Sequence, residues 1–549
     1  MRGQVSGKMR APRRWLFGPV PDLLFGCGLA YAAVFAVQCI AGPQLRELVP
    51  LAVLPIAALI VSTPHYGATL LRVYDDAQER NAHALFALWG TLALCALFWF
   101  GLRSVEVGSL VITLYLTWSP WHYTAQNYGV ALMLLKRRGA EPTPLAVRLL
   151  RASFVISFAL AFFSLHGQGS PPYTPDGISG YQFSVVTLGI PASVRDPAIA
   201  IGSVAWLLAS AGAIGLLARR APLRTLAPTF CLIASQSLWF VLPVIARNWR
   251  LLPGLEPLGL EHAQYSFLWI ALAHAAQYIW ITASYAESTA RASGLGTFYL
   301  RSLAVGSVAW TAPALLFAPG VLGKLPFDAG LGVLVAALVN LHHFMLDGVI
   351  WKLRDRRVSD VLVRSAPAKD AAPLVAPALT PARAMVSAFG ALSLGVSLFS
   401  VFEQSVGVTK GFDRGDVVRV ERAERNLRMV GRASPELQLK IGLLRLRAGE
   451  IDAANRAFDA SLALHPTAAA WVAKGYAAAE KDLFSDALLA YDSALALDPH
   501  HVEALFHSGY ALSKLGRTAD AIARLERAAA RDPANAKVAN LLAALRPAR

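Results

Sequence analysis

The sequence predicts an all-α protein in two parts, a polytopic bundle of transmembrane helices followed by a small solenoid of paired helices. Hydrophobic residues make up 55% of the 549 residues and charged residues only 16%. Residues 1–404 contain repeated apolar runs long enough to cross a bilayer, which takes roughly 20 residues of helix each. Residues 435–549 contain no such run and are rich in Ala, Leu and charge. A membrane domain and a separate helical domain are therefore expected.

About eleven apolar segments are expected to cross the membrane. Basic residues gather at alternate ends of these segments, as in the run Lys136, Arg137 and Arg138. Since cytoplasmic loops carry an excess of Lys and Arg, this pattern predicts a cytoplasmic N-terminus. An odd number of spans then places the C-terminal domain on the periplasmic side of a bacterial inner membrane. The expected spans are 20–42, 48–72, 82–103, 106–135, 146–166, 197–218, 225–246, 260–286, 299–322, 328–352 and 382–402.

The domain limits follow from changes in composition. The membrane domain is expected to occupy 1–404, with a Pro- and Ala-rich linker at 365–382 before its last span. A connector is expected at 405–434 and the repeat domain at 435–549.

The net charge of +16 is explained by these basic loops. Basic and aromatic residues are not interleaved on a soluble face, so the expected partner is the lipid bilayer and not nucleic acid. The four cysteines form no CxxC pair, which gives neither a disulfide framework nor a zinc signature.

The C-terminal part repeats itself with periods of 33 and 34 residues. Gly442, Gly475 and Gly509 set the register. Small residues, large apolar residues and prolines recur at fixed offsets from these glycines, and the prolines end the second helix of each unit. The recurring sets are Ala454, Ala487 and Ala521; Phe458, Tyr491 and Leu525; and Pro466, Pro499 and Pro533.

This pattern resembles the tetratricopeptide repeat, a helix–turn–helix unit of 34 residues, and the unit 469–502 matches it best. The first copy departs from the pattern, with Leu439 where an aromatic residue is usual. The resemblance implies a superhelical scaffold that binds a protein or peptide partner. The signature residues are Trp471, Gly475, Tyr476, Ala487, Tyr491, Pro499, Gly509, Tyr510, Ala521 and Pro533.

Histidines lie at similar depth inside four of the apolar segments. They are His65, His122, His274 and the pair His342 and His343. Ionisable groups inside a bilayer are expensive and usually pair, line a wet cavity or bind something. The four segments run in the same direction in the expected topology, so their imidazoles can lie at one level. A shared intramembrane site is therefore expected.

Imidazole is a common metal ligand, so His65, His122, His274 and His343 are the expected ligands of a metal ion. Asp347 follows His343 by four residues and can coordinate the metal or orient the imidazole. His342 is the alternative to His343, because adjacent helical residues point about 100° apart and both are not expected to bind one ion. Neighbouring polar residues are expected to orient the ligands or the substrate. They are Gln126, Tyr128, Gln277 and Tyr278.

Non-haem iron is the first choice of cofactor, with haem or no cofactor as alternatives. The histidines are similar in arrangement to those of membrane oxygenases and desaturases, although the chain lacks their HxxxH and HxxHH clusters. The resemblance implies a metal-dependent oxidoreductase that acts on an apolar substrate. Two other functions stay open: a proton-coupled transporter, and a membrane scaffold or assembly protein with structural histidines. The absence of P-loop and GxSxG motifs argues against soluble ATP-driven and serine-hydrolase chemistry.

Overall fold

The chain is helical throughout the part that its computed structural model describes. The described residues are 14–41, 53–75, 77–168, 183–249, 260–289, 294–364 and 381–546. In these ranges the only β pairings are two isolated bridges, so the prediction of an all-α fold is confirmed. Nearly all of the linker predicted at 365–382 lies outside the described residues, as do residues 1–13.

Each apolar segment predicted to cross the membrane is mainly helical in its described part, although the segment 299–322 is helical only as far as Leu316. Several are interrupted by short π-helical turns, labelled η. The elements are α1 (Pro19–Pro21), η1 (Asp22–Gly26), α2 (Leu29–Ala41), α4 (Val53–Ala57), η2 (Ala58–Ser62), α5 (Thr63–Tyr74), α6 (Ala77–Ala82), η3 (Leu85–Gly90), α7 (Thr91–Gly101), α8 (Val105–Arg137), α9 (Pro144–His166), α10 (Ala192–Ala218), α11 (Leu223–Gln236), η4 (Ser237–Val241), α12 (Leu242–Asn248), α13 (Leu260–Ser288), α14 (Leu295–Leu316), η6 (Phe327–Leu331), α15 (Gly332–Ile350), α16 (Arg356–Leu362) and α17 (Pro381–Phe402).

Five helices among the described residues are long and apolar enough to cross a membrane. A sixth span results if the pair Pro19–Gly26 and Leu29–Val37, bent by 61°, counts as one crossing. About eleven crossings were predicted. The remaining predicted spans are also helices, but they are shorter, interrupted or less apolar than this criterion requires. The long helices α8 and α13 are among them, and both carry polar side chains of the candidate site.

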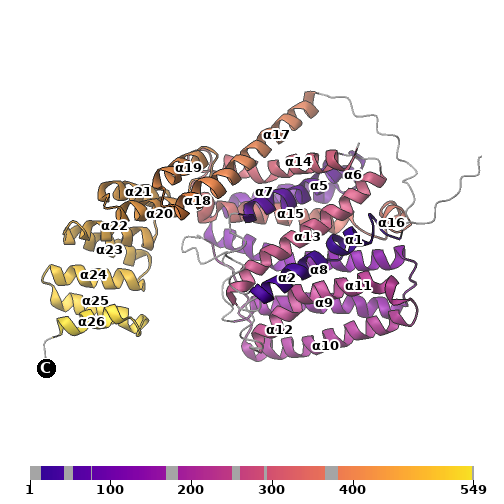
Figure 1. Ribbon diagram of the computed structural model, residues 1–549, viewed down its shortest axis with the longest axis horizontal. Helices are drawn as coiled ribbons and strands as arrows, with labels where there is room; N and C mark the ends of the chain where they lie inside the picture. The colour runs from indigo at the N-terminus through magenta and orange to yellow at the C-terminus, as the bar shows by residue number, and fades with distance from the viewer. Residues whose placement is uncertain are drawn as a thin grey trace, which may run out of the picture. The chain divides into compact units, whose positions relative to one another are not determined.

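The chain divides into two compact units, and the first contains all of the candidate site residues. In this unit α8, α9, α10 and α11 lie side by side (Figure 1). Their contact faces bury a continuous apolar core that includes Leu134, Leu150 and Leu226. Helices α5 and α13 also pack against each other. The site therefore lies among long helices whose positions are fixed by this packing.

The second unit contains the repeats, preceded by η7 (Glu403–Thr409), α18 (Lys410–Asp413) and α19 (Val417–Met429). The helices that follow α19 stack as successive pairs (Figure 1). The pairs are α20 (Pro435–Arg447) with α21 (Ile451–Leu464), α22 (Ala468–Ala479) with α23 (Phe484–Leu497), and α24 (Val502–Lys514) with α25 (Thr518–Arg531); α26 (Ala536–Leu545) ends the array.

The repeating glycines allow the two helices of each pair to approach closely. A Cβ atom at Gly442 would overlap the ring of Phe458, and one at Gly475 would overlap the ring of Tyr491. Each repeat therefore sets a glycine on its first helix against a large side chain on its second. This packing explains why the two positions recur together in the sequence.

Helix caps recur with the same period as the glycines. Ser434, Thr467, His501 and Asn535 each accept a hydrogen bond from the backbone N–H three residues later. Such caps satisfy N–H groups that have no partner within the helix. The repeat in the sequence is therefore a repeat in local structure as well as in packing.

Candidate metal centre

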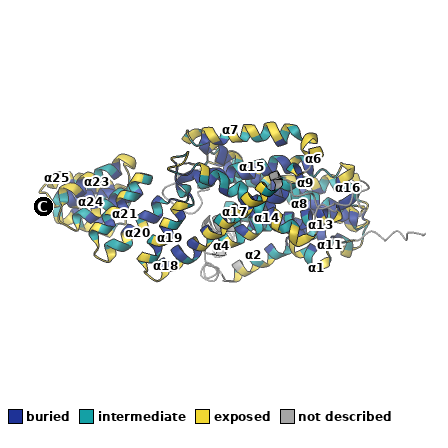
Figure 2. Ribbon diagram, turned by 90° about the horizontal axis from the view of Figure 1, so that it is seen from above, coloured by how far each residue is buried: buried dark blue, intermediate teal, exposed yellow. Residues whose placement is uncertain are grey.

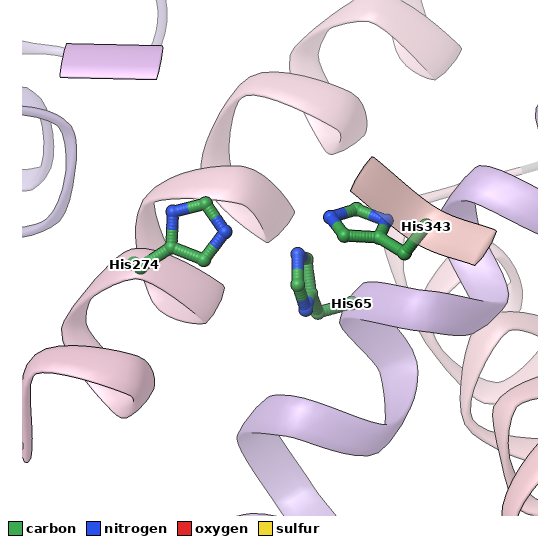
Figure 3. A group of neighbouring side chains, drawn as sticks. All are labelled: His65, His274 and His343. Carbon is green, nitrogen blue, oxygen red and sulfur yellow. The ribbon is translucent and has the colours of Figure 1, made fainter. Parts of the chain in front are cut away.

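Four helices of the first unit bring the predicted histidines together. His65 lies on α5, His122 on α8, His274 on α13 and His343 on α15. The ring centroids of His65 and His343 are 4.1 Å apart, and those of His65 and His274 are 5.0 Å apart. His122 lies 4.9 Å from both His274 and His343. Figure 3 shows the rings of His65, His274 and His343 facing a common space from three helices.

Two groups of three side chains in this cluster have ligand atoms close enough for one metal ion. His65, His274 and His343 form the first group, and His122, His343 and Asp347 form the second. Within each group the ligand atoms lie within 4.8 Å of one another, and all of the residues are buried. Metal–nitrogen bonds are about 2.0–2.1 Å long, so either group would contract around an ion.

Most of the imidazole nitrogens have no hydrogen-bond partner. Both ring nitrogens of His65 and His274 are buried and unpaired, as are Nε2 of His122 and Nε2 of His343, six atoms in all. Buried polar groups are nearly always hydrogen-bonded, and leaving one unpaired costs about 1–3 kcal/mol. Neutral imidazole nitrogens around one space, with a carboxylate beside them, are the donor set of a transition-metal ion.

A chain of hydrogen bonds fixes which nitrogen of His343 is available. The Tyr278 hydroxyl donates to Asp347 Oδ1 at 2.7 Å and accepts from the Trp351 indole N–H at 3.0 Å. Thr69 Oγ1 lies 2.6 Å from Tyr278 Oη and 3.3 Å from Asp347 Oδ1. We assign its single hydrogen to one of these oxygens, because the Tyr278 hydrogen is already used on Asp347. Thr69 therefore accepts from His343 Nδ1–H at 2.8 Å. This tautomer leaves the lone pair of His343 Nε2 directed to the cluster.

Asp347 accepts hydrogen bonds through one oxygen and faces the imidazoles with the other. Its Oδ2 atom lies 3.5 Å from His343 Nε2 and 3.9 Å from His122 Nε2. The carboxylate is thus held by Tyr278 while an oxygen stays near the two nitrogens that a metal would use. The sequence offered two roles for Asp347, and this geometry suits ligation.

Prolines close to two of the histidines change the local helix. The π-helical turn η2 ends at Ser62, and Pro64 is the second residue of α5, directly before His65. Pro120 lies inside α8. The residue directly before it, Ser119, donates a hydrogen bond from Oγ to the carbonyl oxygen of Tyr115 at 2.7 Å. Proline removes a backbone donor and disturbs the helical ladder, which π-helical turns and hydroxyl groups accommodate. His65 therefore lies three residues after a π-helical turn, and His122 lies two residues after a proline within a continuous helix.

The glutamines predicted to orient the ligands form a network that joins helices. Gln126 donates to Oε1 of Gln277 at 2.6 Å and to the backbone carbonyl of His274 at 3.3 Å. Gln277 donates to Oδ1 of Asn127 at 3.0 Å, and Asn127 donates to Gln236 at 2.9 Å. The network therefore holds α8, α13 and α11 together beside the cluster, and it contacts His274 through the backbone carbonyl.

Of the two predicted tyrosines, Tyr278 belongs to the site and Tyr128 lies apart from it. The Tyr278 ring centroid is 4.7 Å from that of His65, whereas Tyr128 packs 6.0 Å from Phe154 on α9. Tyr128 and His122 are six residues apart on α8, which places them on different faces of the helix.

His342 points away from the cluster. Its Nε2 atom lies 2.9 Å from Thr91 Oγ1 and 3.1 Å from the Tyr74 hydroxyl. These polar contacts satisfy His342, whereas Nε2 of its neighbour His343 is unpaired.

Sequence reasoning missed Thr69 and Trp351, which complete the hydrogen-bond chain. Thr69 is four residues after His65, and Trp351 is four residues after Asp347. Residues four apart share a helix face, so this spacing was the available signal.

Two cavities lie beside the cluster. The first has a volume of about 210 Å³ and is lined by residues that include His122, Tyr278 and Asp347. The second has a volume of about 180 Å³ and is lined by residues that include Thr69 and His343.

Comparison with protein families assigns the C-terminal part of the chain. Two models described as tetratricopeptide repeat match residues 439–502 and 477–545. A search of curated proteins found no match to the chain. The matched residues coincide with the helix pairs α20 to α25 and with α26. Residues 439–545 therefore consist of tetratricopeptide repeats.

Proposed function

We propose that the histidine cluster is an intramembrane transition-metal centre. The observation that carries this proposal is that four imidazoles lie around one space and that six of their buried ring nitrogens have no hydrogen-bond partner. The second ligand group, His122, His343 and Asp347, has two histidines and one carboxylate. This is the ligand set of non-haem iron enzymes, so iron is the ion proposed.

The proposed activity is metal-dependent oxidation of an apolar substrate by a multi-pass protein of a bacterial inner membrane. Iron in such a ligand set, with open positions, supports oxygenase chemistry. The protein's own contribution is to hold the ligands: Thr69 orients His343, and Tyr278 orients Asp347. Burial of the site keeps bulk water away from the reacting groups.

The repeat unit is a protein-interaction domain. Tetratricopeptide repeats stack into an extended surface that suits a protein or peptide partner. We propose that this unit recruits such a partner to the membrane unit.

Elemental analysis of the full-length protein, purified in detergent without chelators, tests the metal centre. The wild type is expected to hold about one transition-metal ion per chain, because either ligand group fits one ion. The variant His343→Ala is expected to lose it. His342→Ala is the matched control, because it removes the adjacent histidine that binds Thr91 instead, and it is expected to keep the metal.

Two results would contradict the proposal. One is a wild type that stays free of metal after anaerobic incubation with Fe²⁺. The other is equal metal content in His343→Ala and wild type, with both proteins eluting as the same species in size-exclusion chromatography. If His343→Ala does not fold, the test is repeated with His343→Gln, because glutamine is closer to histidine in volume than alanine is.

The hydrogen-bond chain favours a second candidate, a proton-coupled transporter. His343, Thr69, Tyr278 and Asp347 form a continuous relay. One cavity is lined by Thr69 and His343 and the other by Tyr278 and Asp347, so the relay joins the two. A metal-free wild type whose proton uptake in liposomes is abolished by Thr69→Val would favour this candidate over the metal centre.

A further inference from the structure

Only one of the two ligand groups opens onto the larger cavity. The lining of the 210 Å³ cavity includes His122 and Asp347 from the carboxylate-containing group, but neither His65 nor His274. The smaller cavity is lined by His343 and by neither His122 nor Asp347. An ion held by His122, His343 and Asp347 therefore has space beside it for a further ligand.

The polar and apolar parts of the larger cavity are separated along the helices. On α8 its lining runs from His122 and Gln126 to Val130 and Met133. The step from His122 to Met133 is eleven residues, or about 16 Å of helix at 1.5 Å per residue. On α13 the lining runs in the same order, from Tyr278 to Ile281. Beyond the ligand end, the walls are largely aliphatic.

Glycine creates part of this space. Gly129 on α8 and Gly348 on α15 both line the cavity, and a Cβ atom added at either would meet no atom within 4 Å. Glycine within a helix is destabilising by about 0.5–1 kcal/mol relative to alanine. Because both glycines line the cavity, a larger side chain at either position would project into it.

The geometry points to a substrate-binding cavity for a molecule with one polar end and an apolar body. The polar end of the bound molecule lies at His122 and Asp347, and its apolar body extends along α8 past Gly129 to Met133. None of the described residues that line the cavity is a lysine or an arginine, so the body proposed for it is uncharged. Its volume exceeds the roughly 150 Å³ that holds benzene in an engineered apolar cavity. This inference rests on the proposed metal centre, because the metal is what the polar end approaches.

A pair of metal-binding probes tests the cavity. Imidazole and 1-hexylimidazole carry the same ligating ring, but only the second has an apolar tail. The full-length protein in detergent is loaded with Co²⁺, and the visible spectrum of the ion reports binding of each probe. Since each buried methylene favours binding, wild type is expected to bind 1-hexylimidazole more than about tenfold more tightly than imidazole.

The variant Gly129→Leu is expected to abolish most of this preference while leaving the affinity for imidazole within about twofold of wild type, because only the tail loses its apolar space. Gly215→Leu is the matched control: Gly215 is also a helical glycine whose added Cβ would meet nothing, but it does not line the cavity. Both variants are measured in the same detergent, so partition of the probe into micelles affects them equally. Gly129→Ala is expected to give a smaller loss, and it serves if Gly129→Leu does not fold.

The outcomes separate the two proposals. If the wild type binds no Co²⁺, the metal centre itself is wrong and this inference goes with it. If Co²⁺ binds and the preference for the hexyl tail is absent, or is the same in Gly129→Leu and Gly215→Leu, the metal centre stands and the cavity assignment is wrong.

Discussion

At the scale of single residues, two adjacent histidines have different surroundings. His342 Nε2 lies 2.9 Å from Thr91 Oγ1, whereas His343 uses Nδ1 to bind Thr69 and leaves Nε2 unpaired. The difference follows from helix geometry, since consecutive side chains point about 100° apart. One ring therefore serves contacts between helices and the other faces the cluster.

Replacing Thr69 with valine is predicted to weaken metal binding. The change keeps the shape of the side chain but removes the hydroxyl that holds His343 Nδ1–H, so the ring loses its fixed orientation. Loss of such a supporting hydrogen bond usually costs about 10- to 100-fold in metal affinity. Competition titration of purified protein with a chromophoric chelator measures the effect.

Thr69→Ser keeps the hydroxyl and is the control, with affinity expected close to that of wild type. An unchanged affinity in Thr69→Val would show that the orientation of His343 does not depend on Thr69.

The residues of the cluster also show how far sequence reasoning reached. The depth of each histidine in its segment was readable because a helix rises a constant distance per residue. That four segments would be neighbours was an expectation, since it depends on packing between residues up to 278 positions apart, as in the contact of Thr69 with Asp347. Thr69 itself was missed because its only signal was its spacing of four residues from His65, which many residues in an apolar helix share.

At the scale of elements, α5 and α14 cross at glycines. A Cβ atom at Gly67 would overlap the backbone carbonyl of Ser302, and one at Gly306 would overlap that of Thr63. Small residues at helix crossings let backbones approach closely, which is a common device in membrane proteins. This crossing lies two residues from His65 and therefore helps to set its position.

Substituting Gly306 with alanine is predicted to destabilise the first unit. The added methyl group meets backbone atoms that cannot move independently, and overpacking of this kind costs about 1–3 kcal/mol. A lower midpoint of thermal unfolding in detergent, followed by tryptophan fluorescence, is the expected result.

Gly296→Ala is the matched control on the same helix, because its added Cβ would meet nothing within 4 Å. Equal midpoints for the two variants would contradict the close crossing of α5 and α14.

At the scale of the whole molecule, large apolar side chains cover much of the surface of the first unit. Leu92, Trp99 and Phe100 are exposed on α7, which Figure 2 shows with exposed residues along its length. On α10, Ile201 and Leu208 are 71% and 67% exposed and lie seven residues apart on one face. Large apolar side chains exposed along a helix in this way suit contact with lipid.

Placing lysines on this face of α10 is predicted to impair membrane insertion. Lysine near the middle of a spanning helix costs about 2.5–3.5 kcal/mol on insertion scales, so the double variant Ile201→Lys, Leu208→Lys is expected to accumulate poorly in membranes. The wild type is expected to stay in the membrane pellet after alkaline carbonate extraction, which quantitative immunoblotting measures.

Leu489→Lys is the control, because Leu489 is also 67% exposed but lies on α23 of the repeat unit. Full release of the wild type by carbonate, or normal membrane levels of the double variant, would oppose a lipid-facing role for this surface.

Local periodicity in the sequence accounts for the helices and for the repeats. Apolar run length specified the helices, and the spacing of Gly442, Gly475 and Gly509 specified the repeats, because each repeat buries its core against its neighbours in a fixed register. Which helix faces meet follows from the tertiary packing. It set Tyr128 against Phe154, paired Gln126 with Gln277, and turned His122 and Asp347 toward one cavity. The physical reason is that periodicity fixes the depth and face of a side chain within its own helix, whereas the rotation and neighbours of that helix depend on packing along the whole chain.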